Sequence, residues 1–192
     1  TLCVLRVSVK EGFKNACSFA VSMAMTLTIP SGVIEMEYDA DDDESPLEGY
    51  AHRVGFTVFE DQSLVIKGEG RELSPIKLFP LSMPWNNTFL YAYNYTSGGT
   101  YTVRLSGFEI EGPETGEVAQ DSSGVIDRMF YALGPGSPAA EDGGDVRMTD
   151  IKVSGRFYYG VTSSNDHTSG YFDRCDMTSY VEPMAWFGNV DK

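Results

Sequence analysis

The stretch Ala16–Ile29, ACSFAVSMAMTLTI, decides the fold prediction because bulky and small side chains alternate along all of it. The bulky parity carries Cys17, Phe19, Val21, Met23, Met25, Leu27 and Ile29. Successive side chains of an extended strand point to opposite faces, so this pattern predicts one long strand with the bulky parity in the core. We expect the opposite parity, the Ala, Ser and Thr side chains from Ala16 to Thr28, to be at least partly covered by a second layer.

The first part of this stretch also fits a helix. Between residues 12 and 25 one helical face would carry Phe13, Cys17, Ala20, Val21 and Ala24. The unbroken alternation and the TLTI ending favour the strand, because β-branched residues are typical of strands. We therefore predict a strand, and we expect Val4–Val9 to pair with it around a turn at Glu11-Gly12.

The remaining chain alternates in short segments that are separated by turn residues. Two alternating segments, 88–95 with Tyr91, Tyr93 and Tyr95 and 100–106 with Tyr101, flank Ser97-Gly98-Gly99 and predict a hairpin. Gly107–Glu111 continues the second strand past a glycine bulge. Ile76–Leu81 has prolines beside and within it, which predicts either an edge strand or a segment that covers the sheet. We count about nine to eleven short strands, no long amphipathic helix and no internal repeat. This pattern predicts an all-β fold: one antiparallel, jelly-roll-like β-sandwich domain over residues 1–192, with long polar loops.

Charge and cysteine content narrow the class of protein. The chain has 28 acidic and 14 basic residues, a net charge of −14, and no basic cluster, so we do not expect direct nucleic-acid binding. The sequence holds no apolar run of the length that a membrane-spanning helix needs, so we expect no membrane span. Cys3, Cys17 and Cys175 lack CxxC spacing, which predicts buried free thiols.

An acidic segment begins at Asp39. Asp39, Asp41 and Asp43 match the first, third and fifth positions of a calcium-binding EF-hand loop, and carboxylates are the ligands that Ca²⁺ prefers. The match then fails, because Glu44 stands at the glycine position and Tyr50 at the closing glutamate position. A solvated acidic loop is the favoured interpretation, and the three aspartates are the candidate Ca²⁺ ligands.

Aromatic residues gather around the predicted hairpin: Trp85, Tyr91, Tyr93, Tyr95 and Tyr101. Such rings stack on sugars and also fill protein interfaces, which makes these five the candidate ligand or interface residues. Cross-strand aromatic pairs that stabilise a sheet are the simpler explanation. We favour a core or subunit contact over a sugar site.

Two further patterns are weaker indications. Asp166, His167, Asp173, Cys175 and Asp176 lie close together in the sequence, but their spacing fits no metal motif and is typical of a loop. Asn86 and Asn94 begin formal N-glycosylation triplets.

No nucleophile, P-loop or metalloprotease motif is present, so we expect no enzyme and no cofactor. The sequence favours a non-catalytic structural protein, a virion shell or surface subunit (capsid, spike or decoration) that assembles with copies of itself or with other coat proteins. The first alternative is a secreted or cell-surface adhesin of fimbrial type. The second is a carbohydrate-binding module that uses Trp85 and the Tyr91–Tyr95 face. The expected location is a virion or the extracellular or cell surface.

Overall fold

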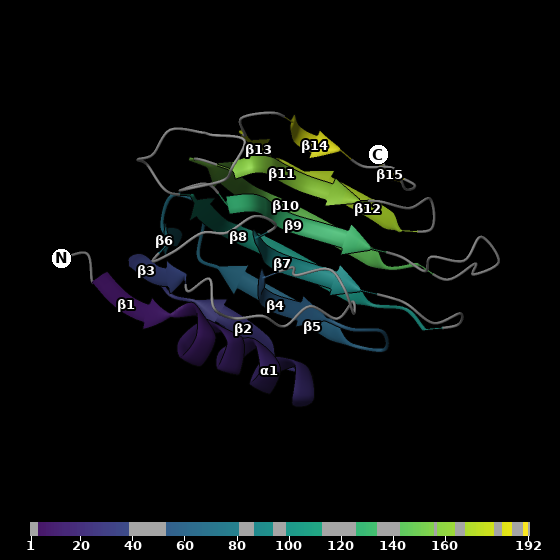
Figure 1. Cartoon of the computed structure of the whole chain (residues 1–192), viewed down its shortest axis with the longest axis horizontal. Helices are drawn as coiled ribbons and strands as arrows, with labels where there is room; N and C mark the ends of the chain where they lie inside the picture. The colour runs from purple at the N-terminus through teal and green to yellow at the C-terminus, as the bar shows by residue number, and fades with distance from the viewer. Residues whose placement is uncertain are drawn as a thin grey trace.

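The fold is made of two sheets of parallel strands (Figure 1). The computed structural model describes residues 4–38, 53–80, 87–93, 99–112, 126–133, 143–155, 157–163, 168–178, 182–185 and 190–191. Every strand pair within these ranges is parallel.

The larger sheet, sheet A, has ten strands and the smaller, sheet B, has five. Sheet A contains β1 (Val4–Ser8), β2 (Thr26–Ile29), β3 (Val33–Tyr38), β5 (Ser63–Gly68), β6 (Pro75–Pro80), β8 (Thr102–Glu111), β10 (Asp145–Ser154), β12 (Ser169–Asp173), β13 (Asp176–Met177) and β15 (Val190–Asp191). Sheet B contains β4 (Arg53–Val58), β7 (Asn87–Tyr93), β9 (Ile126–Leu133), β11 (Phe157–Ser163) and β14 (Glu182–Ala185).

The chain winds through these sheets as a β-solenoid. It passes from β2 through β3 to β4, then from β5 through β6 to β7, and each strand pairs with its equivalent one turn later. The stacks are β2-β5-β8-β10-β12-β15, β3-β6-β8-β10-β13 and β4-β7-β9-β11-β14. Paired residues are roughly 40 positions apart in the first turns and roughly 20 in the last. In Figure 1 the turns stack from the helix to the C-terminal strands.

The predicted antiparallel, jelly-roll-like sandwich is therefore wrong. Strand alternation shows which side chains share a face, but it does not show the direction of the neighbouring strand. The predicted hairpin is also wrong, because β7 lies in sheet B between β4 and β9, whereas β8 lies in sheet A. β6 is no edge strand, since it pairs with both β3 and β8 and carries its prolines at its two ends. The sequence shows no internal repeat, but the structure repeats one turn of strands along the chain.

The opening stretch is mostly helical, so the prediction of one long strand is wrong. A short π-helical segment, η1 (Val9–Lys14), leads into α1 (Asn15–Ser22), and only Thr26–Ile29 forms a strand. Phe13, Cys17 and Ala20 are buried, as the helical alternative predicts, because one side of this segment packs on the core. Ala24, with φ of 51°, lies between the helix and β2.

The predicted faces of this stretch also differ from the structure. Phe19, Met23 and Met25, expected in the core, are 60%, 57% and 52% exposed. On the small parity Ala20 is buried and Ala16 half-buried, while the remaining members are exposed. β1 pairs in parallel with β3 rather than with this stretch.

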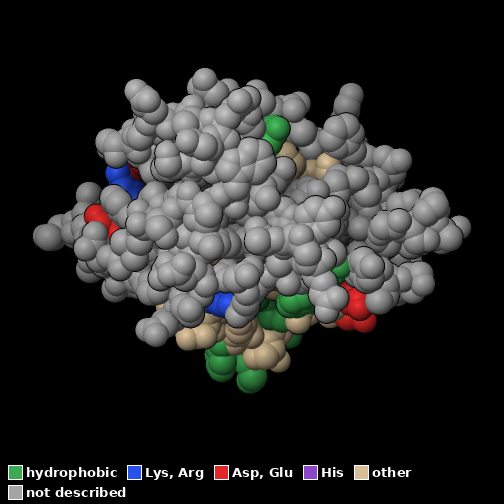
Figure 2. Space-filling model, in the orientation of Figure 1, with side chains coloured by type: hydrophobic (Ala, Val, Ile, Leu, Met, Phe, Trp, Pro, Cys, Tyr) green, Lys and Arg blue, Asp and Glu red, His purple; other side chains and the backbone are tan. Residues whose placement is uncertain are grey.

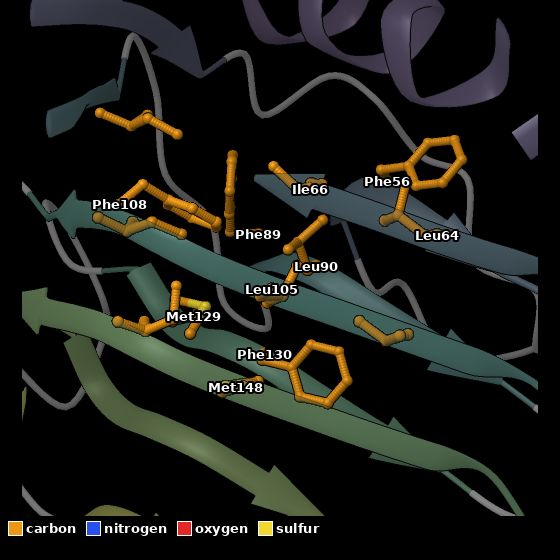
Figure 3. Packing of buried hydrophobic residues seen from close by; sticks show 14 of the residues in the cluster. Phe56, Leu64, Ile66, Phe89, Leu90, Leu105, Phe108, Met129, Phe130 and Met148 are labelled. Atoms are coloured by element: carbon orange, nitrogen blue, oxygen red, sulfur yellow. The ribbon is translucent and has the colours of Figure 1, made fainter. Parts of the chain in front are cut away.

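The core lies between the two sheets and consists of columns of apolar side chains (Figure 3). Parallel register places equivalent residues of successive turns above one another, as in Ile66, Leu105 and Met148 of sheet A. Phe56, Leu90 and Phe130 form the matching column of sheet B. Burying one such side chain contributes about 1.5–3 kcal/mol, so these columns are the main source of stability.

A bend divides sheet A into two halves. Gly107 of β8 has φ of 67°, and its neighbour Asp150 of β10 has φ of 55°. A side chain at Gly107 would be strained by this φ and would place its Cβ 2.8 Å from the Gly68 carbonyl oxygen. β8 continues past this glycine, as predicted. The bend gives β8 and β10 two outer faces, one before it and one after it.

Candidate interaction surfaces

One end of the solenoid is apolar. Phe19, Met23 and Met25, which we call the apolar end, project from α1 and the residues that follow it. Figure 2 shows hydrophobic side chains gathered at this end. The sequence from residue 15 to residue 34 contains no charged side chain, although the whole chain carries a charge of −14. The apolar end therefore lies on a stretch that carries no charge of its own, in a strongly acidic protein.

The opposite side of the helical segment is fixed to the core. The ring of Phe13 stacks on Phe89 of β7 with their centroids 4.9 Å apart. Cys17 is fully buried, and this burial raises the pKa of its thiol far above the ordinary value. Because these contacts anchor η1 and α1, the apolar end is presented on a rigid support.

The outer face of sheet A after the bend is a ladder of ion pairs, which we call the ladder face: Lys77, Glu109, Glu111, Lys152 and Ser154. Lys152 Nζ lies 2.9 Å from Glu109 Oε1, and Ser154 Oγ donates a hydrogen bond of 2.7 Å to the same oxygen. Lys77 Nζ lies 3.1 Å from Glu111 Oε2. The hydrogen bond that Lys152 donates to Glu109 is the main reason that the pKa of Lys152 is raised. Each lysine of this face therefore has its own carboxylate.

The outer face before the bend differs. Its members, which we call the arginine face, are Arg104, Asp145, Arg147 and Tyr171. Arg104 Nη1 donates to the Asp145 carbonyl oxygen at 2.9 Å and to the Val103 carbonyl oxygen at 3.2 Å, while Nη2 pairs with the Asp145 carboxylate. Arg147 Nε lies 3.4 Å from the same carboxylate. Two guanidinium groups thus share one aspartate.

Tyr101 supports this face from inside. It is fully buried, and its hydroxyl lies 3.1 Å from Thr168 Oγ1. A Cβ on Gly144 would lie 1.9 Å from the Tyr101 ring, so only glycine lets the chain pass the ring before β10 begins. Burial raises the pKa of the Tyr101 phenol, which keeps it neutral.

The predicted aromatic candidates lie in the interior as far as they are described. Tyr91 and Tyr93 are buried and stack with ring centroids 6.0 Å apart, and Tyr101 is buried as well. Trp85 and Tyr95 fall outside the described residues. The three described rings offer no open face for a sugar. Tyr171, which the sequence did not single out as a ligand residue, is the partly exposed aromatic of the arginine face.

The other predicted candidates are mostly outside the described ranges: Asp39, Asp41, Asp43, Asn86, Asn94, Asp166, His167 and Cys3. Cys17 and Cys175 are free thiols, the first buried as predicted and the second only half-buried. Cys175 Sγ donates to the Met148 carbonyl oxygen at 3.3 Å. Within the described ranges no three metal-ligating side chains gather in one place.

Comparisons with known proteins give no family, and no family model, curated protein or solved structure matches the chain. Among the helices in the described ranges, none is long and apolar enough to cross a membrane. The functional argument therefore rests on the two surfaces, the apolar end and the arginine face.

Proposed function

We propose that this protein is a non-catalytic structural subunit of a virion or cell-surface assembly, and that it joins a second copy of itself through the apolar end. The observation that carries the proposal is the exposure of Phe19, Met23 and Met25 on an uncharged stretch. Large apolar side chains that gather at a surface mark interaction sites in soluble proteins.

Charge favours a second copy at this position. Two molecules that each carry −14 repel one another, so copies approach most easily where the surface bears no charge. Residues 15–34 provide such a surface. A symmetric contact would place each apolar end against the other, and burying one of these side chains contributes about 1.5–3 kcal/mol.

The solenoid suits this role because its length grows with each stacked turn. Two copies joined at their helical ends would form a rod twice as long, with the C-terminal strands at both tips. Such a rod is a suitable building unit for a spike, a decoration or a fibre.

The test is the oligomeric state of the full chain and of the variant Phe19→Asp/Met23→Asp. We expect the wild-type protein to form dimers in sedimentation velocity experiments and the variant to be monomeric, because each copy would bring two carboxylates into the contact. Both positions are exposed, so the circular dichroism spectrum should stay unchanged.

Met184→Asp is the matched control, because Met184 is 41% exposed on β14 at the opposite edge of sheet B. This variant should dimerise like the wild-type protein. A wild-type chain that stays monomeric at high concentration would refute the proposal, and so would a Met184→Asp variant that dissociates as fully as the double variant.

A further inference from the structure

The arginine face places two like charges next to each other. Arg104 of β8 and Arg147 of β10 are register partners, and Tyr171 of β12 is the register partner of Arg147. Adjacent strands lie about 4.8 Å apart, so the two arginine side chains leave the sheet from neighbouring backbone positions. Like charges directly opposite one another destabilise a sheet unless a counter-charge is present.

Asp145 supplies only part of that counter-charge. Its single carboxylate contacts both arginines, so the group of three keeps one net positive charge on an otherwise acidic protein. The neighbouring Asp173 is already paired, because its Oδ2 lies 3.3 Å from Arg174 Nε. Asp191 of β15 follows in the same column as the register partner of Tyr171, so the excess positive charge belongs to the group of Arg104, Asp145 and Arg147 and not to the whole column.

Arg147 is the member with free hydrogen-bonding capacity. Its side chain is 54% exposed, against 30% for Arg104. Its Nε contacts Asp145, but within the described part of the chain its two η nitrogens have no acceptor. These two nitrogens form a planar fork that matches the two oxygens of a carboxylate.

Tyr171 lies one strand further along the same column and is half-buried. Tyr171 and Arg147 are register partners on the same outer face, so the exposed part of the aromatic ring lies on the strand beside the guanidinium group, and aromatic rings stack on the flat faces of sugars. The positive charge and the aromatic ring together favour a ligand that carries both a negative charge and a flat ring face.

We propose that the arginine face binds a carboxylated saccharide, with the carboxylate on the Arg147 fork and the sugar ring against Tyr171. Arg104 and Asp145 are positioning residues, because Asp145 bridges the two guanidinium groups and holds Nε of Arg147. This site is distinct from the apolar end, so saccharide binding and dimer formation are lost through different substitutions.

The test is isothermal titration of the full chain with an oligogalacturonate and with a neutral galactose oligomer of the same length. We expect binding of the acidic oligomer only, weakened by salt because the Arg147 contact is solvent-exposed. Arg147→Gln should weaken binding about tenfold or more, and Tyr171→Ala should weaken it about fivefold.

Lys67→Gln is the matched control, because Lys67 is an exposed cation of β5 on the same sheet. It should change the affinity less than about twofold. Acetate and inorganic sulfate test whether any small anion occupies the site. Each should bind much more weakly than the acidic oligomer. The proposal is overturned if the acidic oligomer does not bind, or if acetate, sulfate or the neutral oligomer binds as tightly as the acidic oligomer does. It is also overturned if Lys67→Gln weakens binding as much as Arg147→Gln does.

Discussion

The two outer faces of β8 and β10 belong to the same strands but differ in how their cations are paired with carboxylates. On the ladder face, Lys77 and Lys152 each have a glutamate on the neighbouring strand. On the arginine face, Arg104 and Arg147 are neighbours and share Asp145. The register is the same on both sides of the bend, so the difference comes from the choice of residues alone.

This difference separates a face that stabilises the solenoid from one that is available to a ligand. Glu109 is 8% exposed and accepts two hydrogen bonds, so the ladder face is neutral and partly buried. Arg147 is half exposed, and among the described residues its two η nitrogens have no acceptor. Cross-strand pairs of opposite charge stabilise a sheet, whereas the unbalanced arginine contributes little until an anion binds.

The largest expected effect on the free energy of unfolding comes from Gly107, which separates the two faces. Gly107→Ala should lower the free energy of unfolding by roughly 3 kcal/mol, because the new side chain meets the Gly68 carbonyl in a left-handed conformation. Urea denaturation measures this change. Ser106→Ala, one residue earlier and half-buried, is the control and should change stability by less than about 0.5 kcal/mol. A Gly107→Ala variant as stable as the control would show that the bend is unstrained.

The second largest loss of stability is expected on the ladder face. Glu109→Gln should cost about 1.5–3 kcal/mol, because Lys152 loses the carboxylate that accepts its hydrogen bond. Urea denaturation at neutral pH measures this loss. Lys77→Gln removes a more exposed pair and should cost about 1 kcal/mol or less.

The same pair predicts a pH dependence. The pKa of Lys152 is raised in the folded state above the ordinary 10.5, so the stabilisation is complete below pH 10.5 and is lost as the pH rises through the raised value. The stability difference between wild type and Glu109→Gln should therefore narrow in strongly alkaline solution. A difference that stays constant across this range would contradict the assigned role of Lys152.

The smallest effect is expected on the arginine face. Asp145→Asn should lower stability by about 1 kcal/mol or less, because the Asp145 side chain is 39% exposed and solvent screens its pairs. The same substitution should weaken binding of an acidic oligosaccharide, but by less than Arg147→Gln does, because the neutral amide holds Arg147 Nε less firmly than the carboxylate does. A loss of stability as large as that of Glu109→Gln would mean that both faces serve the fold alone.

Local sequence patterns predicted many strands but not their arrangement. Phe56, Val58 and Val161 are buried as their alternation predicts, because alternation depends only on neighbouring residues. The partner of each strand lies a full turn away, and nothing near Leu105 in the sequence indicates Met148 as its neighbour. Parallel register therefore could not be read from single segments.

The two candidate surfaces were missed for related reasons. The apolar end was hidden because Ala, Ser, Phe and Met suit a helix and also alternate by size, and the β-branched residues of Thr26–Ile29 favoured a strand for the whole stretch. Arg104 and Arg147 are separated in sequence, so their pairing depends on the register between β8 and β10. The buried tyrosines were correctly favoured as core residues, and Tyr171 had no distinguishing neighbour.

The stacking of turns also has a consequence for the order of folding during synthesis. Each described strand pairs with a strand of a neighbouring turn, so a turn can form as soon as the preceding one is complete. α1 and the first turn are made first, and they give every later turn a finished edge to pair with. Shortening the turns from roughly 40 to roughly 20 residues lowers the entropy cost of closing each one by only about 0.6 kcal/mol. Synthesis from the N-terminus therefore matches the direction in which the solenoid can grow.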